Sequence, residues 1–174
     1  IPVKNGEKYL DSLLKVVFSQ EVSYGFEVII VDSGSKDRTM DIIRQYPVTL
    51  YQIKPYEFNH GLTRNFGISK AKGKYIVLIT QDAVPYDKLW LGALINNLIS
   101  DKMIVGVYSR QIPRPDAHPL IKLRVNSFFG EQKKRTISYI SDISKYNELS
   151  PIERHSFCAF DNVSSCIKRE VWEK

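Results

Sequence analysis

Apolar residues recur along the first 110 positions in two alternating patterns, and each pattern predicts one kind of element. Short runs rich in β-branched residues predict strands at 26–31, 48–53, 76–79 and 103–108, with 1–3 as the tail of an earlier strand. Helical spacing, clearest at Leu10, Leu13, Leu14 and Val17, predicts helices at 7–19, 37–46, 62–72 and 87–100. This alternation predicts an α/β fold with a mostly parallel, Rossmann-like sheet and helices on both faces.

The pattern changes from Arg110 onward. Residues 120–156 are polar, aromatic and irregular, and one more strand is predicted at 157–163, ahead of a final helix. We expect a single domain over 1–174. Because 1–3 read as the inside of a strand and 168–174 as a helix stopped partway, we also expect a fragment of a longer protein.

Composition narrows the class of protein only moderately. With 174 residues, 43% of them hydrophobic, the chain can bury one substantial core. A net charge of +6 could attract phosphates, anionic lipid or nucleic acid. The basic residues are spread along the chain, however, and the densest run, 133–135, is typical of a solvated loop. The two cysteines match no zinc signature, which indicates free thiols in a reducing, cytoplasmic compartment.

Two acidic loops follow predicted strands: 32–35 (Asp-Ser-Gly-Ser) and 81–83 (Gln-Asp-Ala). In a parallel sheet these loops share one rim, where a nucleotide could bind. One aspartate would accept a hydrogen bond from a base or ribose, and the other would hold a divalent metal that bridges phosphates. A competing interpretation is that Asp82 only caps a turn before Pro85. Arg64 and Asn65, near a predicted helix start, favour an anion.

Neither GxGxxG nor GxxxxGK[ST] occurs, which argues against a dinucleotide oxidoreductase and a P-loop NTPase. Five segments instead resemble, in order and spacing, the motif set of family 2 glycosyltransferases: 1–5, 31–37, 61–67, 71–75 and 80–83. Segments 108–113 and 160–165 further resemble the rhamnosyltransferase branch. The resemblance implies a GT-A nucleotide-diphospho-sugar transferase fold, with 1–109 as the nucleotide-sugar half and 110–174 as a C-terminally truncated acceptor half.

The resemblance also implies roles for individual residues. Pro2 and Val3 would line the base, Asp32 would hydrogen-bond it, and Arg64 would lie near the nucleotide. Gln81 and Asp82 would stand where the family has its DXD metal motif. Because Gln81 and Ala83 depart from that motif, only Asp82 remains as a strong ligand for Mg²⁺ or Mn²⁺, so we expect weak metal affinity without the sugar nucleotide.

The implied reaction is transfer of a sugar, rhamnose being one candidate, from a dTDP- or UDP-sugar to a saccharide or lipid-linked saccharide, with inversion. The resemblance places the catalytic base beyond Lys174. Asp161 is the nearest candidate within the chain and is better assigned to sugar or acceptor contact. Such an enzyme would act in surface polysaccharide synthesis, in the cytoplasm or at the inner membrane face, with peripheral membrane contact and without nucleic acid.

Two other functions compete with this one. A sugar-phosphate nucleotidyltransferase would normally carry a glycine-rich loop with Arg and Lys after the first strand, and 4–7 (Lys-Asn-Gly-Glu) is too short and lacks Arg. A non-catalytic nucleotide- or anion-binding module would bind oligonucleotides in a salt-dependent way.

Overall fold

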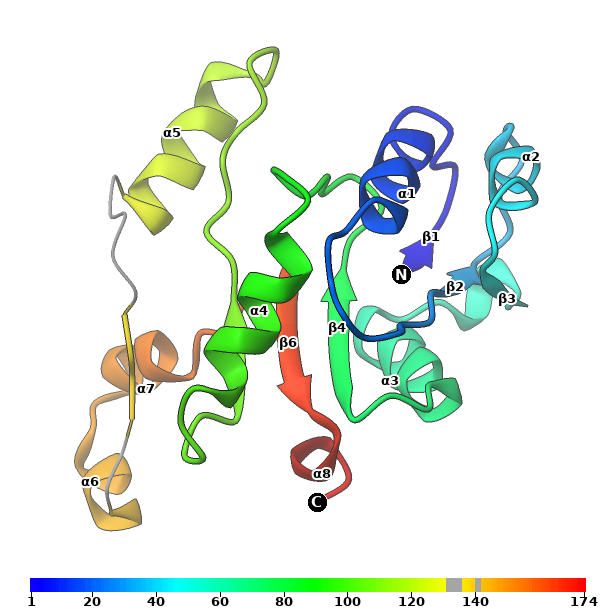
Figure 1. The fold of residues 1–174 in the computed structure, drawn as a ribbon. Helices are drawn as coiled ribbons and strands as arrows, with labels where there is room; N and C mark the ends of the chain where they lie inside the picture. The colour runs from blue at the N-terminus through cyan, green and yellow to red at the C-terminus, as the bar shows by residue number, and fades with distance from the viewer. Residues whose placement is uncertain (131–135, 140–141) are drawn as a thin grey trace. The chain divides into compact units, whose positions relative to one another are not determined.

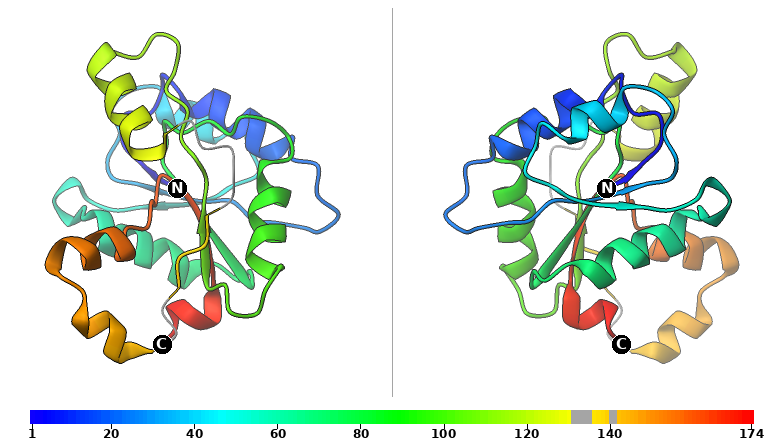
Figure 2. Two further views of the ribbon diagram at one scale, coloured as in Figure 1. Left: turned by 90° about the vertical axis from the view of Figure 1, so that its left-hand side faces the viewer. Right: turned by 90° about the vertical axis from the view of Figure 1, so that its right-hand side faces the viewer.

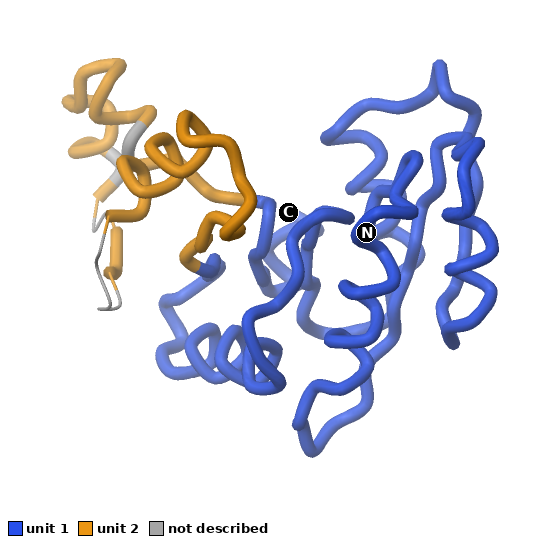
Figure 3. Tube along the Cα trace, turned by 90° about the horizontal axis from the view of Figure 1, so that it is seen from above, with its two compact units in different colours: residues 1–109, 162–174 blue, residues 110–161 orange. Residues whose placement is uncertain are grey.

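The computed structural model describes residues 1–130, 136–139 and 142–174, and the chain divides into two compact units. The first unit comprises residues 1–109 and 162–174, and the second comprises 110–161, as coloured in Figure 3. The expected halves were 1–109 and 110–174. The two units differ from these halves in one respect, because residues 162–174 belong to the first unit. The α/β fold class predicted from the sequence is confirmed.

Three strands of the first unit form a parallel sheet in the order β1-β2-β3: β1 (Pro2–Val3), β2 (Ile29–Asp32) and β3 (Thr49–Gln52) (Figure 1). Helices α1 (Leu10–Phe18) and α2 (Thr39–Ile43) pack on one face of this sheet, and α3 (His60–Lys70) covers the other (Figure 2). Consecutive strand residues point to opposite faces. Thus Ile30 joins the core under α1, whereas Val31 meets Gly67 of α3.

The remaining strands of the first unit form a second sheet in the order β4-β6-β5. In it, β4 (Tyr75–Ile79) and β5 (Gly106–Tyr108) both pair antiparallel with β6 (Ser164–Lys168), which is followed by α8 (Arg169–Trp172). The apolar side of α4 (Trp90–Ile99) packs on this sheet around the buried Cys166. The expected parallel arrangement is therefore found in β1, β2 and β3, whereas β4 and β5 lie in a separate sheet on either side of an antiparallel strand from the far end of the chain.

Two predicted elements are displaced by local capping. The helix expected at 62–72 begins at His60, because the Asn59 side chain accepts hydrogen bonds from the N–H groups of Gly61 and Leu62. The strand expected at 157–163 lies at 164–168 instead. Helix α7 (Pro151–Cys158) occupies the earlier positions, started by a capping box between Ser150 and Glu153.

The second unit is built from short helices: α5 (Pro119–Phe129), α6 (Ile143–Glu148) and α7. Several large apolar side chains of α5 are exposed, among them Leu120, Leu123 and Phe128. A short 3₁₀ helix, η1 (Pro55–Glu57), lies in the first unit, between β3 and α3. Among the described residues, no helix is long and apolar enough to cross a membrane.

Candidate functional site

The loops that follow β1, β2 and β4 are tied together by hydrogen bonds. Asn5 N donates to Ser35 Oγ at 2.8 Å, which joins the first loop to the second. Lys4 N donates to Gln81 Oε1 at 2.8 Å, and Gln81 Nε2 donates to Lys4 O at 3.0 Å, which joins the first loop to the third. The predicted meeting of the two acidic loops at one rim therefore occurs, with the loop after β1 between them.

Asp32 ends β2 and is fully buried, with 0% of its surface exposed. Its carboxylate accepts hydrogen bonds from Gly34 N at 3.1 Å, from Ser35 N at 3.2 Å and from the Ser35 hydroxyl. Gly34 has a φ of 85°, and a Cβ there would lie 2.7 Å from Pro55 Cγ. A buried carboxylate needs such donors. Asp32 therefore fixes the shape of the loop from within, and only a glycine fits at its bend.

Hydrogen bonds also join the loop after β1 to the start of α2. Gly6 N donates to Thr39 Oγ1 at 2.7 Å, and Glu7 N donates to Asp37 Oδ2 at 3.1 Å. Although partial burial alone would raise the pKa of Asp37, hydrogen bonds from the Thr39 hydroxyl and from the N–H groups of Glu7 and Thr39 lower it. Asp37 is therefore held as a carboxylate that orders this part of the rim.

Gln81 has a structural role that the sequence does not reveal. Its amide oxygen and nitrogen pair with the backbone N–H and C=O of Lys4, as a neighbouring strand would. The side chain is thus committed to joining β4 to β1. Only the tertiary contact identifies this role, because the two residues are 77 positions apart.

Asp82 lies in a tight turn closed by the hydrogen bond from Ala83 N to Thr80 O at 3.1 Å, and it is exposed. No three His, Cys, Asp or Glu side chains of the described residues come together as a metal site. The donor set nevertheless fits a hard cation that takes one carboxylate and completes its shell with diphosphate oxygens and water. Asp82 thus lies exposed at this rim, beside the ordered loops.

Arg64 and Asn65 lie in the second turn of α3, not at its first residues. The Arg64 guanidinium donates to His60 O at 2.9 Å, and Asn65 Oδ1 accepts from Trp172 Nε1 at 3.2 Å. Because α8 follows the end of β6 that pairs with Tyr75, Asn65 faces the beginning of β4, away from Asp82. The structure therefore brings Val3, Asp32, Gln81 and Asp82 to one rim but leaves Asn65 outside it.

Asp161 belongs to the second unit, where it lines a cavity of about 630 Å³. Gln111 Nε2 donates to Asp161 Oδ2 at 2.6 Å. The other side chains around this cavity include Arg124 and the rings of Phe128 and Phe160. The cavity combines hydrogen-bonding groups with aromatic surface, a mixture found in sites for small organic ligands.

Solved structures with the same arrangement of elements define the class of fold. The mannosyltransferase PcManGT from Pyrobaculum calidifontis, in complex with GDP-Man and Mn²⁺, is 20% identical with a TM-score of 0.63, over 99% of this chain and 44% of that one. The glucosyl-3-phosphoglycerate synthase of Mycobacterium tuberculosis, in complex with UDP, is 17% identical with a TM-score of 0.65, over 98% and 55% of the two chains. The fold is that of the GT-A glycosyltransferases.

Sequence comparison gives the family. Residues 1–157 match the profile of Glycosyl transferase family 2, and the chain belongs to this family. The O-antigen chain rhamnosyltransferase RfbN of Salmonella typhimurium is 32% identical over 100% of this chain and 52% of its own length. WbaN of Salmonella anatum, with the same description, is 33% identical over 82% of this chain and 45% of its own length. The chain thus spans about half the length of these curated relatives.

Proposed function

We propose that this chain binds the nucleoside diphosphate sugar of an inverting glycosyltransferase, with a dTDP- or UDP-linked hexose, rhamnose in the first place, as donor. The observation that carries the proposal is the rim itself, where three ordered loops surround an exposed aspartate at the carboxyl ends of β1, β2 and β4. In open α/β sheets ligands bind at such strand ends. The similarity to O-antigen rhamnosyltransferases supports rhamnose as the sugar.

The proposal gives each of the following residues a role in binding the donor. Pro2 and Val3 form the floor beside the base, and Asp32 holds the loop against which the base and ribose lie. Gln81 fixes the Asp82 turn, so that the Asp82 carboxylate faces the diphosphate. A divalent cation bound by Asp82 and the diphosphate would stabilise the charge that builds on the leaving group. Arg64 adds positive charge on the α3 side of β1.

We assign the cavity of the second unit to the acceptor. Asp161, Gln111 and Arg124 offer acceptors and donors for sugar hydroxyls, and the phenylalanine rings suit the apolar faces of a saccharide. In the reaction a base takes the proton of the acceptor hydroxyl and the acceptor oxygen bonds to the anomeric carbon. The bond between the anomeric carbon and the phosphate oxygen breaks at the same time, and the nucleoside diphosphate leaves. A lipid-linked saccharide at the inner membrane face is the proposed acceptor, and the net charge of +6 suits an anionic lipid surface.

Calorimetric titration of dTDP, UDP and GDP, with and without Mn²⁺, tests the donor assignment. Asp82→Asn should weaken Mn²⁺-dependent binding at least about tenfold. Asp101→Asn is the matched control, because Asp101 is also exposed but precedes β5, at the opposite end of the sheet. Binding of no nucleotide, or equal loss in both variants, would contradict the proposal.

The acceptor assignment is tested separately. Asp161→Asn should raise the KM for a saccharide acceptor while leaving nucleotide affinity unchanged. Inversion is tested by the anomeric configuration of the product in NMR spectra. A product that keeps the configuration of the donor would refute the single-displacement mechanism while leaving donor binding intact.

A further inference from the structure

Helix α5 of the second unit has an apolar composition but no buried residue. Six of its eleven residues are Leu, Ile, Val or Phe, and none of the eleven is buried. Helix α4 of the first unit is similarly rich in apolar residues, and it buries four of them in the core. A helix with apolar residues on most sides is normally covered by other structure. The exposed side of α5 is therefore a surface that we expect another component to cover.

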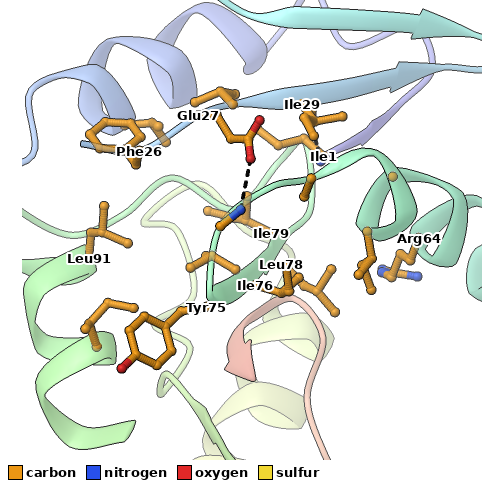
Figure 4. A pocket seen from close by; sticks show the side chains of 18 of the residues that line it. Ile1, Phe26, Glu27, Ile29, Arg64, Tyr75, Ile76, Leu78, Ile79 and Leu91 are labelled. Carbon is orange, nitrogen blue, oxygen red and sulfur yellow. Dashed lines mark hydrogen bonds between the residues drawn. The ribbon is translucent and has the colours of Figure 1, made fainter. Parts of the chain in front are cut away.

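The large apolar side chains of β4 and α4 face inward instead. Figure 4 shows those of Ile76, Ile79 and Leu91 around a cavity of about 220 Å³ in the first unit, and all three are buried. Leu120 and Leu123 of α5, by contrast, expose 68% and 65% of their surface. Single exposed leucines are common on protein surfaces, but a cluster of them in one turn of one helix indicates an interaction surface.

The ends of α5 are fixed by local contacts. The His118 side chain accepts a hydrogen bond from Leu120 N at 3.2 Å, and Pro119 occupies the first helical position, where its missing N–H is not needed. At the other end Gly130 N donates to Asn126 O at 2.7 Å. Within the described part of the chain, no other helix or strand packs along α5. Its apolar side chains are therefore left for a contact outside the described residues.

The charge around α5 indicates the kind of partner that covers it. Positions 110–130 carry four Lys or Arg residues and one acidic residue, Asp116. Two of the basic residues, Lys122 and Arg124, alternate with the exposed apolar residues of α5, and α5 itself has no acidic residue. Residues 142–158, which contain α6 and α7, carry three acidic residues and two basic ones. Positive charge thus gathers at α5, which suits a negatively charged partner.

We propose that α5 docks the second unit on an anionic phospholipid bilayer by lying in the bilayer surface. Leu120, Ile121 and Leu123 would enter the boundary between headgroups and acyl chains, and Lys122 and Arg124 would contact the lipid phosphates. The Lys122 ammonium group donates to Pro115 O at 2.6 Å and keeps two further N–H groups for a phosphate. A second protein chain suits this surface less, because the cores of protein interfaces are depleted in lysine.

The same helix leads from this docking surface to the cavity that we assign to the acceptor. Arg124 and Phe128 line that cavity. Leu120 lies four positions before Arg124, and Arg124 lies four positions before Phe128, so the three form a row along α5. A bilayer that takes up Leu120 would therefore lie beside the cavity, where the saccharide of a lipid-linked acceptor could enter. The inference deepens the proposed function, on which it rests for the lipid-linked acceptor.

Co-sedimentation with lipid vesicles, in the absence of nucleotide and acceptor, tests the docking surface. The chain should bind vesicles that contain about 30% phosphatidylglycerol at least about tenfold more tightly than vesicles of phosphatidylcholine alone. Raising NaCl from about 0.1 M to about 0.5 M should weaken this binding, because salt screens the attraction. The double variant Leu120→Gln, Leu123→Gln should bind the anionic vesicles at least about tenfold more weakly. Glutamine replaces leucine here because it forms helices almost as readily.

Ile152→Gln is the matched control. Ile152 exposes 80% of its surface and belongs to α7 of the same unit, where acidic residues outnumber basic ones. This variant should bind the anionic vesicles as the native chain does. Fluorescence quenching by brominated lipid gives the position of the contact, since the indole of Leu123→Trp should be quenched and that of Ile152→Trp should not. Both chains keep Trp90 and Trp172, so the difference between them reports the introduced indole.

Three results would overturn the proposal: no vesicle binding by the native chain, equal binding by the native chain and the double variant, or equal quenching of the two introduced indoles. A dimer of the native chain that the double variant abolishes, measured by light scattering without vesicles, would also overturn it, because a second copy would then cover α5.

Nucleotide titration separates these failures from others. The double variant should bind nucleotides as the native chain does, which shows that the first unit is intact, and its circular dichroism should match that of the native chain, which shows that α5 still forms. Failure of the proposed donor site would appear in the nucleotide titration of the native chain, whereas failure of the docking surface would appear only with vesicles.

Discussion

Replacing Asp32 by asparagine tests whether its buried carboxylate organises the rim. One carboxylate oxygen accepts from the Ser35 hydroxyl and, at 3.2 Å, from Ser35 N. The other accepts from Gly34 N at 3.1 Å and Ser35 N at 3.3 Å. Asparagine keeps the shape but turns one oxygen into a donor. In its better orientation the new amide nitrogen faces the Ser35 hydroxyl, which can rotate to accept.

The expected loss follows from the change of charge. A hydrogen bond to a charged group contributes about 1.5–3 kcal/mol, against about 1 kcal/mol for a neutral pair. Weakening the bonds from the three donors, Gly34 N, Ser35 N and Ser35 Oγ, thus removes roughly 3 kcal/mol. Burying a neutral amide in place of a carboxylate returns roughly 1 kcal/mol. We therefore expect the free energy of unfolding to fall by about 2 kcal/mol.

Urea denaturation at pH 7 measures this change as a lower midpoint with an unchanged slope. Asp82→Asn is the matched control, because Asp82 is exposed and its substitution should change stability by less than about 0.5 kcal/mol. The two variants should thus separate, with Asp32→Asn affecting stability and Asp82→Asn affecting Mn²⁺-dependent nucleotide binding. A stability loss below about 0.5 kcal/mol for Asp32→Asn would refute the reasoning, since desolvation of the carboxylate would then offset its hydrogen bonds.

Three further variants or reactions test other parts of the first unit. Gly34→Ala should lower the free energy of unfolding by about 2 kcal/mol in urea titrations because of its φ of 85°, whereas Gly25→Ala, with nothing within 4 Å, should change it by less than about 0.5 kcal/mol. Gln81→Ala should lower it by about 1 kcal/mol and speed exchange of the backbone amide that it accepts from. Burial raises the pKa of Cys166 to about 12, so iodoacetamide at pH 8 should alkylate the native Cys166 at least about 100-fold more slowly than the exposed Cys158.

Each of these expectations has a contrary result. Equal stability of the two alanine variants would mean that the loop at Gly34 adapts without strain. An unchanged amide exchange rate in Gln81→Ala would mean that the side chain does not hold β4 to β1. Equal alkylation rates in mass spectra would mean that α4 and β6 open far more often than their packing around Cys166 implies.

The sequence by itself determined the elements whose signals are local. The spacing of Leu10, Leu13, Leu14 and Val17 predicted a helix, and these four side chains are the buried face of α1. The alternation of strands and helices predicted the α/β class, and the ordered motifs predicted the family to which the chain belongs. These patterns are readable because helical and strand periodicities are properties of short windows of sequence.

Tertiary structure alone decided which segments meet. Nothing near Gln81 in the sequence indicates that its amide pairs with Lys4, and nothing near Ser164 indicates that β6 lies between β4 and β5. The burial of Asp32 among its own loop donors likewise appears only when that loop has folded. A contact between residues that are distant in the sequence depends on the packing of the whole unit. The sequence around one residue therefore does not identify the residue that it contacts.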